Sequence, residues 1–233
     1  MAMQTVVVQG KPYSVHMPQN ADAAEKLPVV YLCGGETEEI LKGIELAQKV
    51  CPPFMVVFAP PADWWRDLSP WKSGPIGFGG NTFGGQADVY LQFLQNTLKP
   101  AVDARFGTLS APEDTYIMGY SLAGLTALYA LFGYTAFGNA ACLSGSLWFR
   151  GWLGFARKNK SLHPNATIHL SVGKGERKSR NKFMNKILPC YEQTYRLLQP
   201  QCGRITLQLH NGGHDYEIAQ RYACALMDLL KEA

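Results

Sequence analysis

Short apolar, β-rich runs alternate along this chain with longer stretches in which apolar residues recur at the helical period. This alternation predicts a mostly parallel sheet with helices on both faces. The predicted strands are Thr5–Val8, Tyr13–Met17, Val29–Leu32, Met55–Ala59, Thr115–Met118, Ala140–Leu143, Thr167–Val172 and Ile205–Leu209. The predicted helices are Thr37–Lys49, Gln86–Arg105, Ser121–Leu131, Lys182–Leu198 and Tyr216–Lys231. The sequence therefore indicates the α/β fold class.

The N-terminal part departs from the parallel pattern. Its first two runs flank Gly10, Lys11 and Pro12, which supply a turn, and so predict an antiparallel hairpin at an edge of the sheet. The chain has 233 residues, of which 47% are hydrophobic, enough for one large core. We expect residues 1–233 to form a single domain.

The stretch Pro60–Gly85 has no clear period and is rich in Pro, Gly and aromatic residues. Its aromatic residues are Trp64, Trp65, Trp71, Phe78 and Phe83. A connection of this length in a domain is either functional or disordered, so we expect an ordered loop near a site. The alternative is that the aromatic side chains only staple the connection to the core.

The net charge of the chain is small and excludes few classes of function. The chain has 22 Lys plus Arg and 18 Asp plus Glu, a formal net charge of +4, which is too small an excess to argue for nucleic-acid binding. One stretch is strongly basic, and Glu176 is its only acid. Its basic residues are Arg150, Arg157, Lys158, Lys160, Lys174, Arg177, Lys178, Arg180, Lys182 and Lys186. This stretch is either a solvated face or a region that attracts an anionic substrate to the rim of a site.

Cysteines and hydropathy bear on the compartment. The six cysteines are scattered without a CxxC pair, and no secretory leader pattern precedes them, so we expect a reducing cytoplasm. Most of them should act as small core residues. No apolar run approaches the roughly 20 residues that cross a bilayer, and we expect no membrane partner.

Ser121 joins a predicted strand to a predicted helix within Gly119-Tyr120-Ser121-Leu122-Ala123. This is the context of the G-x-S-x-G nucleophile elbow, in which a strained serine raises its hydroxyl above the sheet and the residues two positions away must be small. Gly119 and Ala123 satisfy that, although Ala123 replaces the usual Gly. Ser121 is therefore the candidate nucleophile, and the Leu122 N–H is the candidate oxyanion donor. A chance match or an ordinary helix N-cap is the alternative.

A serine hydroxyl needs a base to take its proton. Of five histidines, His214 alone lies in a glycine loop, Asn211-Gly212-Gly213-His214, between the last predicted strand and the last predicted helix. The two glycines allow a sharp turn that leaves the imidazole free to reach the carboxyl edge of the sheet. His214 is therefore the candidate base.

The candidate acid follows from chain order, which in this kind of site runs serine, carboxylate, histidine. That order indicates the loop after Thr167–Val172, where Glu176 is the only carboxylate. A plain salt bridge to the neighbouring basic residues is the alternative role for Glu176. Asp215 is the rival acid, although its place beside His214 makes contact with Nδ1 awkward.

Metal binding is not expected. His210 and His214 are four residues apart, a spacing that can bind zinc on a helix, but Gly212 and Gly213 break any helix between them. We expect no cofactor either.

Several blocks together resemble the putative-esterase group of α/β-hydrolases, which includes enterochelin-type siderophore esterases and relatives of esterase D. The blocks run from about Pro28 to the C-terminal helix. They are Tyr31-Leu32-Cys33-Gly34-Gly35-Glu36, Asp63-Trp64-Trp65-Arg66-Asp67-Leu68-Ser69-Pro70-Trp71, Phe83-Gly84-Gly85, Gly119-Tyr120-Ser121-Leu122-Ala123-Gly124-Leu125, Ser144-Gly145-Ser146-Leu147-Trp148 and Asn211-Gly212-Gly213-His214. The resemblance implies an α/β-hydrolase fold, a mostly parallel central sheet with helices on both faces.

The resemblance also implies roles. It implies Ser121 as nucleophile, His214 as base, Glu176 as acid, and an oxyanion hole formed by backbone N–H groups of Leu122 and of the Gly35-Glu36 segment. The residues expected to line the substrate pocket are Trp64, Trp65, Arg66, Trp71 and Trp148. Lys174 stands where many relatives carry an acid, so the third member of the triad departs most from the family pattern.

The function expected from these residues is hydrolysis of a small-molecule carboxylic ester through an acyl-enzyme on Ser121. Two alternatives remain open: acyl transfer, because a dry aromatic pocket can exclude water, and a non-catalytic binding protein on the same scaffold. The sequence does not determine the substrate or the oligomeric state, a homo-oligomer included.

Overall fold

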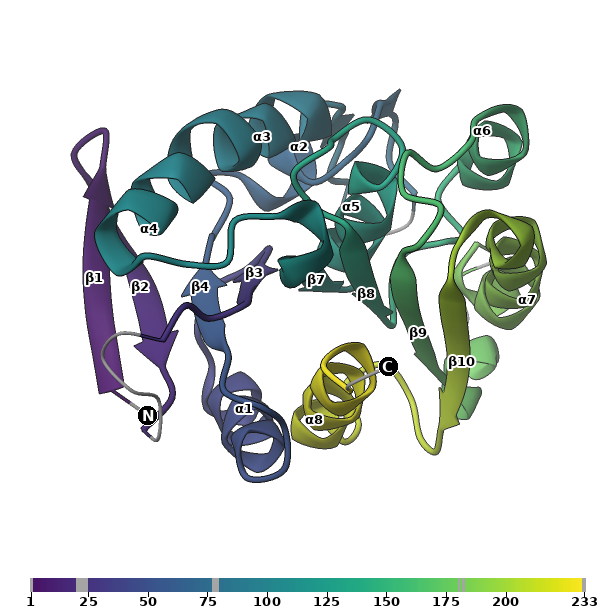
Figure 1. The fold of residues 1–233 in the computed structure, drawn as a ribbon. Helices are drawn as coiled ribbons and strands as arrows, with labels where there is room; N and C mark the ends of the chain where they lie inside the picture. The colour runs from purple at the N-terminus through teal and green to yellow at the C-terminus, as the bar shows by residue number, and fades with distance from the viewer. Residues whose placement is uncertain (1, 20–24, 77–79, 180, 182, 232–233) are drawn as a thin grey trace.

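An eight-stranded sheet forms the centre of the computed structural model, which describes residues 2–19, 25–76, 80–179, 181 and 183–231. The strand order is β1-β2-β4-β3-β7-β8-β9-β10 (Figure 1). The strands are β1 (Ala2–Val8), β2 (Lys11–Met17), β3 (Val29–Leu32), β4 (Met55–Phe58), β7 (Thr115–Tyr120), β8 (Asn139–Leu143), β9 (Thr167–Gly173) and β10 (Arg204–His210). All eight predicted strands are confirmed, with shifts only at their ends.

The register explains where a site can form. β1 and β2 pair antiparallel, as predicted, and β2 also pairs antiparallel with β4. From β4 through β3, β7, β8, β9 and β10 every pairing is parallel. The carboxyl ends of these strands therefore meet at one edge, which is where open α/β sheets bind ligands.

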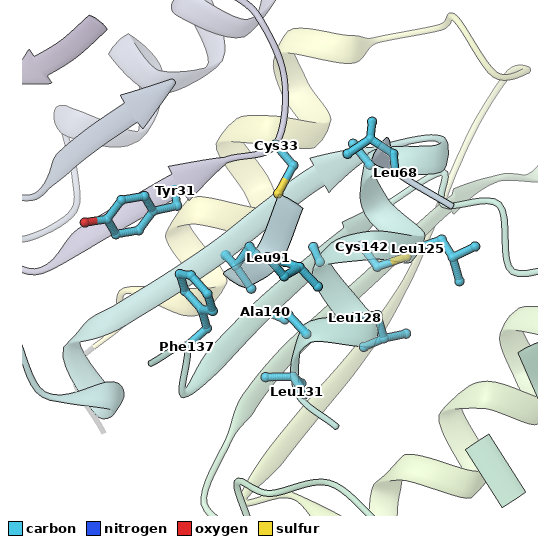
Figure 2. Close-up of a cluster of buried hydrophobic side chains, with 14 of the residues drawn as sticks. Tyr31, Cys33, Leu68, Leu91, Leu125, Leu128, Leu131, Phe137, Ala140 and Cys142 are labelled. Carbon is cyan, nitrogen blue, oxygen red and sulfur yellow. The ribbon is translucent and has the colours of Figure 1, made fainter. Parts of the chain in front are cut away.

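Helices cover both faces of the sheet (Figure 1). On one face lie α1 (Glu38–Gln48) and α8 (Ile218–Leu229), which bury one apolar cluster against the sheet. On the other face a larger cluster packs beneath five longer helices, and Figure 2 shows Leu68, Leu91 and Leu125 among its members. These helices are α3 (Ala87–Phe93), α4 (Lys99–Phe106), α5 (Leu122–Ala130), α6 (Trp152–Lys158) and α7 (Ile187–Leu198).

The prediction of one unbroken helix over Gln86–Arg105 was wrong. Between α3 and α4 the backbone takes a π-helical turn at Leu94–Leu98. Pro100 follows at the start of α4, and a proline has no N–H to donate to the carbonyl four residues earlier, which favours a change of hydrogen-bond pattern here. Lys182, the predicted start of the next helix, lies outside the described residues, and a 3₁₀ turn at Met184–Lys186 precedes α7.

The stretch Pro60–Gly85 contains short elements that the sequence pattern did not predict. They are α2 (Trp64–Asp67), β5 (Lys72–Ser73) and β6 (Phe83–Gly84), and Phe78 lies outside the described residues. The helix α6 was also missed. Further 3₁₀ turns lie at Pro112–Asp114, Lys174–Lys178 and Gln199–Gln201. Helices of four and seven residues are too short to show a clear period.

Only Cys33 and Cys142 are fully buried in the core, fewer than the prediction of mostly core cysteines, and burial raises the pKa of each thiol to about 12. The other four cysteines are half-buried, and all six are free thiols. Within the described ranges no helix is both long and apolar enough to cross a membrane.

A buried charge network ties α8 to the sheet and gives a stability prediction. Asp228 accepts hydrogen bonds from His169 Nδ1 at 2.9 Å and from Arg204 Nη1 at 2.6 Å. Burial would raise the pKa of Asp228, but hydrogen bonds from His169, Thr206 and Arg204 outweigh it and hold that pKa well below its usual range. A carboxyl whose pKa is lowered on folding stabilises the fold above its unfolded pKa of about 4, and this contribution is lost as the pH falls.

We expect Asp228→Asn to lower the free energy of unfolding at pH 7 by about 2 kcal/mol, the size of a charge-assisted hydrogen bond. The difference from wild type should shrink as the pH falls from about 5 towards 2. Urea unfolding at a series of pH values measures it. A difference that stays constant with pH would contradict the assignment.

Candidate active site

Ser121 lies at the turn from β7 into α5, with φ 59° and ψ −123°. A positive φ is a strained conformation for a residue with a Cβ, as the elbow motif predicts. The turn is held on both sides, because the Ser121 N–H donates to Leu143 O at 2.9 Å and the Ser146 N–H donates to Ser121 O at 3.0 Å. The strained serine is therefore built into the backbone where the carboxyl ends of β7 and β8 meet.

Close packing at this turn explains the small residues around the serine. A Cβ added to Gly119 would lie 2.3 Å from the carbonyl carbon of Ala123, which is impossible without moving the backbone. A Cβ on Gly124 would lie 2.9 Å from Gly119 O. The extra methyl group of Ala123 is accommodated within the buried turn, where Ala123 is 1% exposed.

The candidate oxyanion donors lie in the segments that follow two neighbouring strands, β3 and β7. Leu122 is the first residue of α5, and a helix leaves its first N–H groups without partners inside the helix. Gly35 and Glu36 follow β3, which pairs in parallel with β7 through Leu32 and Met118, so both segments lie at the same edge. The Glu36 side chain is not part of this assignment: its carboxylate lies beside His16, with Glu36 Oε1 3.3 Å from His16 Nε2. The oxyanion assignment stays a prediction.

The imidazole of His214 meets Glu176. His214 Nδ1 lies 2.9 Å from Glu176 Oε2, and the Glu176 carboxylate is almost fully buried while the imidazole is 27% exposed. Asp215, the rival acid, is the next residue along the chain, but Nδ1 faces Glu176. The two loops also touch through their backbones, because the Gly175 N–H donates to Gly212 O at 2.6 Å.

Hydrogen bonds fix the Glu176 carboxylate in its ionised form. Oε1 accepts from the Gly173 N–H at 2.8 Å and from Ser144 Oγ at 2.7 Å. Burial would raise the pKa of Glu176, but the hydrogen bonds from His214, the Gly173 backbone and Ser144 outweigh it and lower that pKa below its ordinary value. An ionised acid bonded to Nδ1 leaves Nε2 as the nitrogen that can take a proton.

Tyr120 links the base loop to the nucleophile's strand. Its hydroxyl donates a hydrogen bond to the carbonyl oxygen of His214, and its ring centroid lies 5.3 Å from that of the imidazole. Tyr120 immediately precedes Ser121. Among the described residues no hydrogen bond joins the Ser121 hydroxyl to the imidazole, as is common in sites without substrate.

The predicted pocket residues fall into two groups. Trp65 and Trp71 belong to an aromatic cluster that staples the stretch Pro60–Gly85 to α5 and α6. Trp71 contacts Tyr129, Phe149 and Phe155 and donates from Nε1 to Arg150 O at 2.7 Å, and Trp65 packs on Phe83.

The remaining pocket candidates are placed differently. Trp148 is 9% exposed, whereas Trp64 is 36% exposed. The Arg66 guanidinium pairs with Asp67, with Nε 2.6 Å from Oδ1. These contacts support the staple interpretation for Trp65 and Trp71, and the substrate-binding role of all five residues stays a prediction.

Three residues that surround Glu176 and His214 were given no role in the sequence analysis: Tyr120, Ser144 and Arg221. Arg221 is fully buried and lies 3.4 Å from Glu176 Oε1. A signal existed, because Arg221 falls on the apolar stripe of α8 together with Tyr222, Ala225 and Leu229. A charged residue on a core-facing stripe is uncommon unless it is paired.

The parallel sheet, the strained serine turn and the histidine loop at the same edge define an α/β-hydrolase fold. Residues 10–225 match the Putative esterase family, and the chain belongs to that family.

Relatives agree with this class. A curated relative, the siderophore triacetylfusarinine C esterase of Aspergillus fumigatus, is 43% identical over 67 residues, which cover 28% of this chain and only 20% of the relative. Three solved structures share the fold at low identity. The IroE-like serine hydrolase of Shewanella oneidensis has a TM-score of 0.82 at 18% identity, covering 98% of this chain and 80% of its own. The siderophore hydrolase EstA of Aspergillus nidulans has a TM-score of 0.79 at 21% identity, and the match covers 97% of this chain and 92% of EstA. The enterobactin esterase FES of Shigella flexneri has a TM-score of 0.73 at 19% identity, and the match covers 98% of this chain and 59% of FES.

The strain at Ser121 can be measured. We expect Ser121→Gly to be about 1 kcal/mol more stable than Ser121→Ala, because glycine adopts a positive φ without cost whereas alanine keeps the strain. Urea unfolding of the two variants gives the difference. At Ala104, an exposed position in α4, the same exchange of Ala for Gly should lower stability by about 1 kcal/mol. If glycine changed the stability relative to alanine in the same direction at both positions, the strain assigned to Ser121 would be wrong.

Proposed function

We propose that the protein hydrolyses carboxylic esters through a covalent acyl-enzyme on Ser121, with His214 as general base and Glu176 as the acid that orients it. The observation that carries the proposal is the 2.9 Å contact between His214 Nδ1 and Glu176 Oε2, on a loop that is hydrogen-bonded to Tyr120, the last residue of the strand before Ser121. Nucleophile, base and orienting acid then share one edge of the sheet.

The mechanism follows from these positions. Ser121 Oγ attacks the ester carbonyl carbon while its proton passes to His214 Nε2, and the Leu122 and Glu36 N–H groups stabilise the negative charge on the carbonyl oxygen. The tetrahedral intermediate collapses when His214 returns the proton to the departing alkoxide, which leaves as an alcohol. Water then attacks the acyl-enzyme carbonyl as His214 takes one of its protons, and His214 returns that proton to Ser121 Oγ as the carboxylic acid leaves, which restores the enzyme. Glu176 stays ionised throughout and stabilises the imidazolium.

The relatives suggest a substrate class. Two of the three solved neighbours and the curated relative are described as siderophore or enterobactin esterases or hydrolases. Eight of the ten basic residues in the Arg150–Lys186 stretch are described, and all eight are exposed. Arg180 and Lys182 lie outside the described residues. Lys174, Arg177 and Lys178 flank Glu176 in one 3₁₀ turn, so positive charge surrounds the rim next to the acid. We therefore propose siderophore-type esters with anionic character as substrates.

Removing the nucleophile tests the reaction. Ser121→Ala should lower kcat/KM for p-nitrophenyl acetate at least about 1,000-fold while the protein stays folded, because no other group can form the acyl-enzyme. Ser161→Ala, a serine in the loop after α6, is the control and should keep full activity. Wild-type Ser121 should also be labelled by a fluorophosphonate probe. Turnover by Ser121→Ala at the wild-type rate, or failure of the wild type to be labelled, would refute the proposal.

Separate variants of the two carboxylates test the acid. Glu176→Gln should lower kcat by about 100-fold or more, because the imidazole loses the anion that fixes its tautomer and stabilises its charged form. Asp215→Asn should change kcat by less than about threefold. Steady-state kinetics at neutral pH on the same ester measure both. A larger loss in Asp215→Asn than in Glu176→Gln would reverse the assignment.

Substrate choice is tested with an ester panel. Ferric enterobactin, whose catecholates give the iron complex a net negative charge, should be hydrolysed with a higher kcat/KM than uncharged p-nitrophenyl esters of similar acyl size. Raising the ionic strength should reduce that advantage, because screening weakens attraction between the basic rim and an anionic substrate. Preference for uncharged esters at every ionic strength would contradict the substrate class.

A further inference from the structure

Arg221 occupies an unusual position for a cation. It lies in the first turn of α8, its side chain is completely buried, and its neighbour Tyr222 belongs to the apolar cluster under the sheet. Long charged side chains are rarely buried without partners. The question is therefore where its guanidinium hydrogen bonds go.

The hydrogen bonds of the Arg221 guanidinium are all made to residues in or around the Ser121, Glu176 and His214 site. Nη1 donates to Ser144 Oγ, to Tyr120 Oη at 3.0 Å and to Glu176 Oε1 at 3.4 Å. Nη2 donates to Gly213 O at 2.7 Å. Nε has no hydrogen-bond partner among the described residues. One planar fork thus joins the end of β7, the turn after β8, the acid's turn and the base loop.

The backbone around the fork is shaped to admit it. A Cβ added to Gly173 would lie 2.7 Å from Arg221 Nη2 and 2.7 Å from Gly212 O, so glycine leaves the space that the guanidinium and the base loop share. Ser144 is buried with φ 42°, and its hydroxyl bridges Arg221 Nη1 to Glu176 Oε1. A strained non-glycine residue persists only where its surroundings over-determine it, and such residues cluster at active sites.

The two ends of the fork reach the neighbours of the reacting residues. Tyr120 precedes Ser121, and Gly213 precedes His214. The Tyr120 hydroxyl that accepts from Arg221 also donates to the His214 carbonyl, so both routes from Arg221 lead to the base loop.

We propose that Arg221 is a positioning residue: its buried guanidinium sets the distance between the Ser121 elbow and the His214 loop and holds Glu176 against the imidazole. The proposal rests on the proposed hydrolase function and adds a group that does not touch the substrate. Because the fork is rigid and two-pronged, a lysine, with a single ammonium, cannot hold both ends at once.

Kinetics of three variants test the role. Arg221→Met should lower kcat for p-nitrophenyl acetate by about 100-fold with KM within about threefold, because small displacements of catalytic groups cost rate rather than binding. The kcat of Arg221→Lys should lie between that of Arg221→Met and that of the wild type. Arg204→Met is the matched control, since Arg204 pairs with Asp228 at the other end of α8. It should lower Tm and leave kcat unchanged. Wild-type kcat in folded Arg221→Met, or an equal loss of kcat in Arg204→Met, would overturn the proposal.

Two further measurements keep the test decisive if Arg221→Met does not fold. Tyr120→Phe removes only the hydroxyl between Arg221 and the His214 carbonyl, and should lower kcat about tenfold with KM unchanged. Wild-type kcat in both Tyr120→Phe and Arg221→Lys would overturn the proposal.

The second measurement does not depend on turnover. The downfield NMR resonance of the His214 Nδ1 proton, assigned with His214→Gln, reports the hydrogen bond to Glu176. It should be present in wild type, Ser121→Ala and Arg204→Met, and lost or shifted in Arg221→Lys. An unchanged resonance in Arg221→Lys contradicts the positioning role even if the protein hydrolyses esters. A changed resonance in a protein that no ester or fluorophosphonate modifies supports the positioning role and refutes the hydrolase function instead.

Discussion

The structure around the site depends on one backbone constraint, the positive φ of Ser121. The turn brings the carbonyl of Ala123 so close to Gly119 that no side chain fits between them, and it is held by hydrogen bonds to Leu143 and Ser146 from the neighbouring strand and turn. Strain of this kind costs on the order of 1–3 kcal/mol, which the buried packing of α5 against β7 and β8 must offset. In return the serine hydroxyl lies where α5 begins, and the first N–H groups of a helix have no partner inside the helix.

A second constraint is electrostatic. Glu176 and Arg221 are both buried beneath the rim, and taking two charges out of water costs several kcal/mol for each ion unless hydrogen bonds replace the water. The Glu176 carboxylate is hydrogen-bonded to Gly173, Ser144 and His214, and these hydrogen bonds lower its pKa despite its burial. A buried ion pair is weak evidence for stability. Its placement between the base loop and the elbow fits better with orientation of the imidazole.

Much of the fold could be predicted because it is encoded locally. Each central strand is a short apolar run bounded by turn residues, and α1 begins at Thr37, whose hydroxyl accepts from the Ile40 N–H as a helix cap should. Elements set by contacts rather than by period were missed: α2 and α6 are too short for a pattern, and their place follows from aromatic packing such as that of Trp71 on Phe155. The break between α3 and α4 depends on a hydrogen-bond choice near Pro100 that hydrophobic periodicity does not record.

The sequence by itself determined the chemistry available: a serine in a strand-to-helix turn, a histidine on a glycine loop and carboxylates nearby, because these residue types and their small neighbours are local properties of the chain. Only the tertiary structure decided which carboxylate meets the imidazole. Glu176 and His214 are 38 residues apart, and their 2.9 Å contact exists because β9 and β10 pair in parallel and bring the loops that follow them to one edge. Packing of α8 against the sheet brings Arg221 beneath both loops, a position that no spacing in the sequence specifies.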